Sequence, residues 1–80
     1  MSAILYMEIT MLFIITVPQS KTSVAMSRVL NDLADALQTA CGFLRLGLEG
    51  IAISSSGKRI EGRRLERACQ NGELSTRDFV

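Results

Sequence analysis

The chain has 80 residues, of which 48% are hydrophobic and 21% are charged, and its formal net charge is +1. These values exclude an intrinsically disordered chain, which would be less apolar, and they predict one domain over residues 1–80. A domain this short buries only about 60% of the surface of its unfolded chain, so oligomerisation is a common source of added stability.

The sequence contains no histidine and only two cysteines, Cys41 and Cys69. Without histidine there is no Ser–His or Cys–His dyad, and the commonest general base near neutral pH is missing. Two cysteines cannot complete a closed zinc site within one chain. The composition therefore predicts a protein that is not an enzyme and that uses no metal and no cofactor.

The sequence leaves the state of the two cysteines open. A disulfide-stapled miniprotein usually has four or more cysteines, so two favour free buried thiols in a reducing compartment and a cytoplasmic location. The alternative is a single bond between Cys41 and Cys69, which requires their Cα atoms to lie within about 7 Å.

The most hydrophobic part of the chain is the run from Ile4 to Val17. It is shorter than the about 20 apolar residues of a transmembrane helix, and it contains Glu8. The first basic residue, Lys21, follows the run, whereas a signal peptide begins with a basic region. We therefore expect no membrane span. A membrane-associated segment remains the alternative to a β-strand.

A period of two in residues 4–17 predicts a β-strand. Every odd position from Leu5 to Val17 is apolar, whereas the even positions are mixed, and successive side chains of a strand point to opposite faces. Pro18 is expected to end the strand. The apolar residues of the mixed face are predicted to form a contact between subunits of a homo-oligomer. The residues of this predicted contact are Tyr6, Leu12 and Ile14.

The next element is predicted to be a helix over residues 24–41, because its apolar residues recur at intervals of three and four. Ser20, Thr22 and Ser23 are candidate N-caps. Gly42 is the expected residue after the helix.

Alternation of leucines with other residues predicts a second strand over residues 44–48, interrupted by Gly50 and resumed at Ile51–Ile53. Residues 54–57 have the composition of a turn, and Lys58–Ile60 is a candidate return strand.

A second helix is predicted after Gly62, because Leu65, Ala68 and Cys69 have helical spacing, and Gly72 is expected to end it. A capped turn is predicted over residues 75–78. The apolar residues that follow it are Phe79 and Val80, and we expect them to pack back onto the core.

The predicted order of elements is β-α-β-β-α. A strand–helix–strand unit favours two parallel strands joined by a right-handed crossover. The predicted fold class is α+β, a two-layer sandwich with both helices on the apolar face of a small sheet.

Five basic residues and two acidic ones lie within residues 58–67, a local net charge of +3. The candidate residues for binding an anion or a partner are Lys58, Arg59, Arg63, Arg64 and Arg67. Arginines present forked donors that suit phosphate and carboxylate. The like-charged pair Arg63–Arg67 is one helical turn apart, which is unfavourable unless an acid lies nearby. Asp32 and Asp35 of the first predicted helix, or an external anion, are the candidates.

Three interpretations of this basic cluster stay open: a solvated surface, a site for an acidic protein partner, and a nucleic-acid site. No aromatic residue near the cluster could stack on a base, and the sequence pI of about 7.8 is low for a nucleic-acid-binding domain. The stretch Ser54–Lys58 does not match a phosphate-binding P-loop, because Ala52 stands at the position of its first glycine and Arg59 follows the lysine.

The order of elements, the Ile51–Ile53 strand with its serine–glycine turn and Lys58, and the ending Asp78-Phe79-Val80 resemble the DinI-like proteins. These are small bacterial and phage regulators of the DNA-damage response. The resemblance covers most of the chain in outline and implies a βαββα fold. In that family the second helix is strongly acidic and engages a recombinase filament. Here that helix carries Arg63, Arg64 and Arg67, so the resemblance does not extend the family's recombinase binding to this chain.

Together these patterns predict a small non-enzymatic regulatory or inhibitory module that binds a protein partner, in one interpretation an acidic one, and that associates with itself. The alternative is a small nucleic-acid-binding module that uses the basic cluster of residues 58–67.

Overall fold

The computed structural model describes residues 11–21 and 24–79. Within these residues the elements are β1 (Phe13–Val17), β2 (Met26–Leu30), α1 (Leu33–Arg45), β3 (Ala52–Ser55), β4 (Lys58–Glu61), α2 (Gly62–Asn71) and the 3-10 helix η2 (Thr76–Phe79). The four strands form one sheet in the order β2-β1-β3-β4, and all neighbours are antiparallel.

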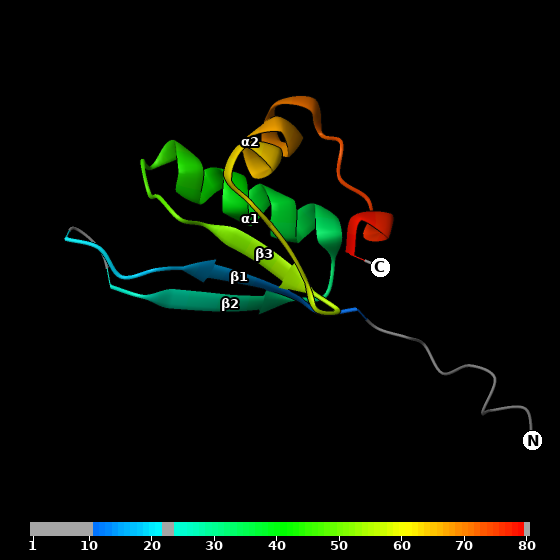
Figure 1. The fold of residues 1–80 in the computed structure, drawn as a ribbon, viewed down its shortest axis with the longest axis horizontal. Coiled ribbons are helices and arrows are strands. Elements are labelled where there is room, and N and C mark those ends of the chain that lie inside the picture. Colours follow the sequence, from blue (N-terminus) through cyan, green and yellow to red (C-terminus); the bar gives the residue numbers. More distant parts are fainter. Residues whose placement is uncertain (1–10, 22–23, 80) are drawn as a thin grey trace, which may run out of the picture.

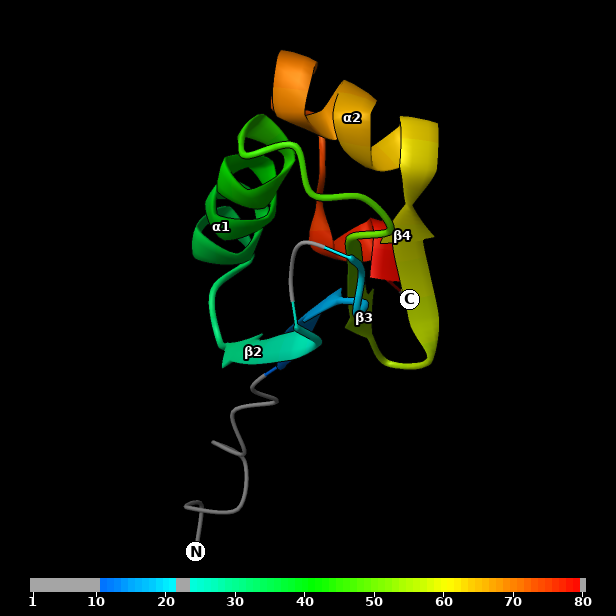
Figure 2. The ribbon, with the colours of Figure 1, turned by 90° about the vertical axis from the view of Figure 1, so that its left-hand side faces the viewer.

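Both α-helices lie on the same side of the sheet, and η2 lies beside β4 near the carboxy terminus (Figures 1 and 2). The predicted fold class, an α+β sandwich of two layers, is confirmed. No described element covers the opposite face of the sheet (Figure 1). We call that face the open face.

β1 supplies the centre of the core, as its period of two predicted. Phe13, Ile15 and Val17 are at most 2% exposed. Within the described residues this strand begins at Phe13, and residues 4–10 of the predicted strand lie outside them. Among the described residues, the central core cluster contains ten buried residues: Phe13, Ile15, Val17, Ala36, Ala40, Ile51, Ile53, Ile60, Leu65 and Phe79.

The prediction of a helix over residues 24–41 is wrong in its first half, where the chain forms β2. β2 pairs with β1 along its whole length, from Val17↔Met26 to Phe13↔Leu30. The helix begins only after Asp32, whose side chain accepts a hydrogen bond from the Asp35 N–H at 3.3 Å. The apolar residues keep spacings of three and four from β2 into α1, so the pattern alone suggests one continuous helix. Pairing with β1 makes the first part a strand despite that pattern.

The predicted parallel pairing of the strand that ends at Val17 with the strand at Ile51–Ile53 is wrong, because β2 reverses the chain before α1 and β3 runs antiparallel to β1. α1 then returns the chain to the end of the sheet from which β3 runs antiparallel to β1. β2 and β3 are both antiparallel to β1 and lie on either side of it, so they run parallel to each other and α1 makes a crossover between them over β1.

α1 continues past Gly42, so the predicted helix end at Gly42 and the predicted strand over residues 44–48 are wrong. Gly47 has φ +85°, its N–H donates to the Leu44 carbonyl at 3.0 Å, and the Leu48 N–H donates to the Phe43 carbonyl at 3.2 Å. These two bonds form a Schellman motif, which ends a helix at a left-handed residue. Of the leucines that alternate in the sequence, Leu44 and Leu48 pack against the core, whereas Leu46 is exposed.

β3 and β4 form a tight hairpin, which confirms the predicted return strand. Its loop is Ser56 and Gly57, with φ values of +52° and +79°, as a two-residue type I′ turn requires. Ser54 and Ser55, predicted to lie in the turn, belong to β3. The serine-rich stretch is therefore a hairpin.

The carboxy-terminal predictions are confirmed for the described residues, and Val80 of the predicted apolar tail lies outside them. α2 ends at Gly72, which has φ +67° and donates its N–H to the Ala68 carbonyl at 2.7 Å. In the predicted capped turn the Ser75 N–H donates to Asp78 Oδ2 at 2.9 Å. Phe79 is fully buried, with its ring 5.4 Å from that of Phe13.

The favoured prediction of free thiols is wrong, and the alternative of one disulfide is confirmed. Cys41 of α1 and Cys69 of α2 are bonded, with their Cα atoms 5.7 Å apart. Both residues lie on the sides of the helices that face each other, and sequence spacing alone does not show that the two helices are neighbours. Disulfides persist in oxidising compartments, and the cytoplasmic location stays a prediction. In a reducing cytoplasm these two side chains would be neighbouring thiols without the bond.

Gly50, just before β3, packs against Pro18, just after β1. A Cβ on Gly50 would lie 2.7 Å from Pro18 Cγ, and the residue has φ +75°. We expect Gly50→Ala to lower the free energy of unfolding by about 2–3 kcal/mol, because the new methyl group adds a clash to the strained backbone. Denaturant unfolding followed by circular dichroism measures this effect.

Gly47→Ala is the matched control for this prediction. Gly47 has a similar φ, +85°, but no atom lies within 4 Å of its Cβ position. The free energy of unfolding of Gly47→Ala should fall only by the cost of the strained backbone, about 1 kcal/mol. Equal losses for the two variants would show that the contact with Pro18 does not matter.

Candidate interaction surfaces

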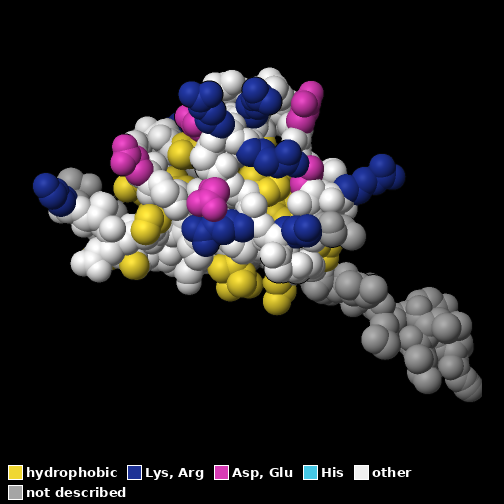
Figure 3. Space-filling view, in the orientation of Figure 1, with side chains coloured by type: hydrophobic (Ala, Val, Ile, Leu, Met, Phe, Trp, Pro, Cys, Tyr) yellow, Lys and Arg dark blue, Asp and Glu magenta, His cyan; other side chains and the backbone are white. Residues whose placement is uncertain are grey.

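The first candidate surface is an apolar patch on the open face, formed by Leu12, Ile14 and Val29. Ile14 of β1 is paired directly with Val29 of β2, so both side chains project from the same face. Their exposed fractions are 39% and 58%, and that of Leu12 is 53%. In Figure 3 hydrophobic side chains gather along the lower margin of the molecule, on the side of the sheet away from the helices.

Two of the three residues predicted for an oligomer contact, Leu12 and Ile14, thus lie together on an exposed surface. The third, Tyr6, lies outside the described residues. The sequence prediction missed Val29, because the helical spacing assigned it to the core side of a helix. Residues 26–30, Met-Ser-Arg-Val-Leu, do not alternate between apolar and polar, so no strand signal competed with the helical spacing.

One side of the apolar patch is bordered by an ion pair on β4. Arg59 Nε lies 2.8 Å from Glu61 Oε2, and both side chains are about half exposed. The register aligns Arg59 with Ser54 and Ile14, so Arg59 and Glu61 belong to the open face. The open face therefore combines an apolar centre with one positive and one negative group at its β4 edge.

The second candidate surface is a depression of about 510 Å³ between α2 and the segment that follows it. Its lining residues are Arg63, Arg64, Arg67, Ala68, Asn71, Glu73 and Asp78. Arg64 Nη2 pairs with Asp78 Oδ1, and the same carboxylate accepts the Ser75 N–H through Oδ2. We call this depression, with these lining residues, the arginine depression.

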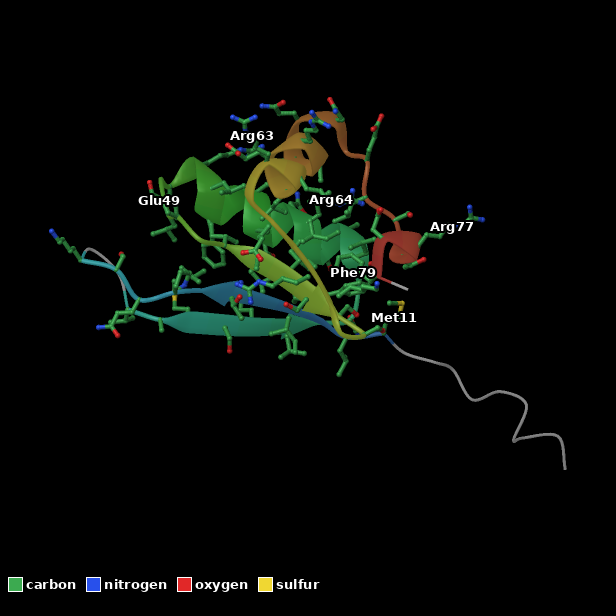
Figure 4. The ribbon with its side chains drawn as sticks, in the orientation of Figure 1. Met11, Glu49, Arg63, Arg64, Arg77 and Phe79 are labelled. Carbon is green, nitrogen blue, oxygen red and sulfur yellow. A yellow bond between two sulfur atoms is a disulfide. The ribbon has the colours of Figure 1, made fainter. Side chains whose placement is uncertain are left out.

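The structure divides the predicted basic cluster into two parts. Lys58 and Arg59 lie on β4, away from the arginine depression, and Arg59 is paired with Glu61. Only the three arginines of α2 line the depression. Figure 4 shows Arg64 on the side of α2 near the carboxy-terminal segment, with Arg63 farther from that segment.

Within residues 11–21 and 24–79, no acidic side chain lies within ion-pair distance of Arg63 or Arg67. Asp32 and Asp35, the candidates in the sequence, form no ion pair in this part of the chain either. Asp32 caps the start of α1 instead. The acid that does reach α2 is Asp78, and it pairs with Arg64, so Arg63 and Arg67 have no ion-pair partner among the described residues.

The described residues contain no group of three or more Cys, Asp and Glu side chains placed to hold a metal ion. In the same part of the chain, no helix has the length and hydrophobicity needed to cross a membrane.

Comparison with protein-family models, with curated proteins and with solved structures found no significant match to this chain. The resemblance to DinI-like proteins therefore stays a prediction. Proposals about function depend on the geometry of the two surfaces.

Proposed function

We propose that this protein is a small non-enzymatic protein-interaction module, regulatory or inhibitory in role, that associates with itself through the open face of its sheet. The observation that carries the proposal is the direct pairing of Ile14 with Val29 on a face that no described element covers. Contiguous exposed apolar residues rimmed by polar groups are typical of protein interaction sites.

A second copy of the chain suits this face because its charges are self-complementary. In a two-fold contact the same patch meets itself, so the positive and negative groups at the rim can pair across the interface. Arg59 and Glu61 supply one group of each sign beside the apolar residues. An 80-residue chain also gains more from such a contact than a larger domain would.

The proposal predicts that Ile14→Thr combined with Val29→Thr raises the Kd of self-association by about 100-fold or more. The two substitutions remove four apolar side chains from a symmetric dimer, and a loss of about 0.7 kcal/mol for each amounts to about 100-fold in Kd. Threonine retains the β-branched shape that suits a strand, so the fold should persist. Sedimentation equilibrium over a range of concentrations measures the Kd.

Leu46→Thr is the control, because Leu46 is also highly exposed, at 75%, but lies at the end of α1. It should leave the Kd unchanged. A wild-type chain that stays monomeric at all concentrations would contradict the proposal, as would equal effects of the control and the double substitution.

A further inference from the structure

The arginine depression contains two cationic side chains that have no acidic partner among the described residues. Arg63 and Arg67 are one turn apart on α2, so their guanidinium groups project on the same side of the helix. Both line the depression. Keeping two like charges this close is unfavourable unless an anion binds between them or near them.

The wall of the depression is held in place by several contacts. Leu65 and Ala68 anchor α2 in the core, and the Cys41–Cys69 bond ties the helix to α1. On the other side, burial of Phe79 fixes η2. Binding an anion here requires little ordering of the backbone, which favours affinity.

The charges of the depression favour a discrete carboxylate over a nucleic-acid backbone. Three arginines and two acids, Glu73 and Asp78, line it, so its net charge is only +1. A nucleic-acid strand presents a row of phosphates, and the two carboxylates would repel it. A single side-chain carboxylate can reach Arg63 and Arg67 while avoiding both acids. The pair of Arg64 with Asp78 shows carboxylate recognition within the same depression.

We propose that the arginine depression is a binding site for an acidic segment of a protein partner, with Arg63 and Arg67 as the groups that bind its carboxylates. Asn71 lines the same depression and offers an amide that can bond to the backbone of the segment. This inference rests on the proposed function in treating the protein as an interaction module, but it uses a different surface from the open face.

The test uses fluorescence anisotropy with a labelled, end-capped peptide of alternating glutamate and serine. Arg63→Gln with Arg67→Gln should weaken its binding about tenfold or more, because two charge-assisted contacts are lost. The matched control is Lys58→Gln with Arg77→Gln. It removes the same net charge from exposed positions that do not line the depression, and it should change the affinity less than about twofold.

Asp78→Asn gives a second, independent readout. It removes the internal carboxylate that occupies Arg64, while the amide oxygen can still accept the Ser75 N–H. Peptide binding should become about threefold to tenfold tighter, because a third guanidinium is released and a repelling charge is lost.

Three results would overturn the inference. One is no peptide binding to the wild-type chain at concentrations up to about 1 mM. Another is equal weakening by the two double substitutions, which would mean that only overall charge matters. The third is binding of single-stranded DNA in preference to the peptide at the same salt concentration, with a steep loss of affinity as salt rises.

The same assay on the chain with Ile14→Thr and Val29→Thr separates the two proposals. Unchanged peptide binding by that variant would support the acidic-segment site whether or not the wild-type chain associates with itself. Self-association without peptide binding would leave only the open-face proposal standing.

Discussion

Phe79→Ala is expected to lower the free energy of unfolding by about 3–5 kcal/mol, the largest effect of a single substitution that we predict. Phe79 is fully buried although it lies next to the end of the chain. Its ring meets that of Phe13 at a centroid distance of 5.4 Å and an interplanar angle of 72°, an edge-to-face contact. Such pairs contribute about 0.5–1.5 kcal/mol beyond the burial of their surface.

The loss should be severe because small domains have little stability in reserve, with free energies of unfolding of about 5–15 kcal/mol across proteins. Urea unfolding followed by circular dichroism measures it. Phe79→Leu is the matched control: it keeps a branched apolar side chain in the core but loses the ring contact, and it should lose about 1–2 kcal/mol. If the alanine variant unfolded at the same urea concentration as the wild type, the carboxy-terminal segment would not be part of the core.

Phe79 also connects the core to the arginine depression. It is the last residue of η2, and its neighbour Asp78 pairs with Arg64. Removing the ring should therefore release η2 and loosen the wall of the depression. Peptide binding should weaken in Phe79→Ala but persist in Phe79→Leu.

The second large effect is expected on reduction of the disulfide. Breaking the Cys41–Cys69 bond should lower the free energy of unfolding by about 2–4 kcal/mol, because the oxidised bond restricts the unfolded chain. The sequence separation of 28 residues closes a loop of substantial length. For a domain of this size, the loss corresponds to a decrease in Tm of roughly 10–25 °C.

Thermal unfolding with and without a phosphine reductant measures this effect. The control is the double substitution Cys41→Ala with Cys69→Ala, which should have a Tm close to that of the reduced wild type and should not respond to reductant. A wild-type Tm that is the same in both conditions would show that the bond is absent from the protein in solution or does not stabilise it.

Residues with a strong local signal were predicted correctly from the sequence. Val17 and the other odd residues of β1 are buried, Gly72 ends α2 in a left-handed conformation, and Phe79 returns to the core. Each of these depends on nearby residues: alternation along one strand, a glycine after an amphipathic helix, or an apolar residue after a polar turn. Tertiary context did not compete with these signals.

Predictions failed where one pattern fitted two structures. Met26, Val29 and Leu30 satisfy a helical spacing, and they also occupy a strand that is exposed along most of its length. Leu44, Leu46 and Leu48 alternate as in a strand, yet they lie at the end of α1 and in the turn where Gly47 closes the helix. In both regions the tertiary neighbours decided the outcome, because they determined which pairing or packing surface was available.

By itself, the sequence determined the chemical inventory of this protein and the class of its fold. The sequence lacks histidine, and it contains an apolar strand, a basic second helix, and two helices suited to one side of a sheet. Only the tertiary structure decided which groups meet. It paired Ile14 with Val29, bonded Cys41 to Cys69, and brought Asp78 to Arg64. Those contacts join residues far apart in the chain, and their distances depend on how whole elements pack, which no local pattern records.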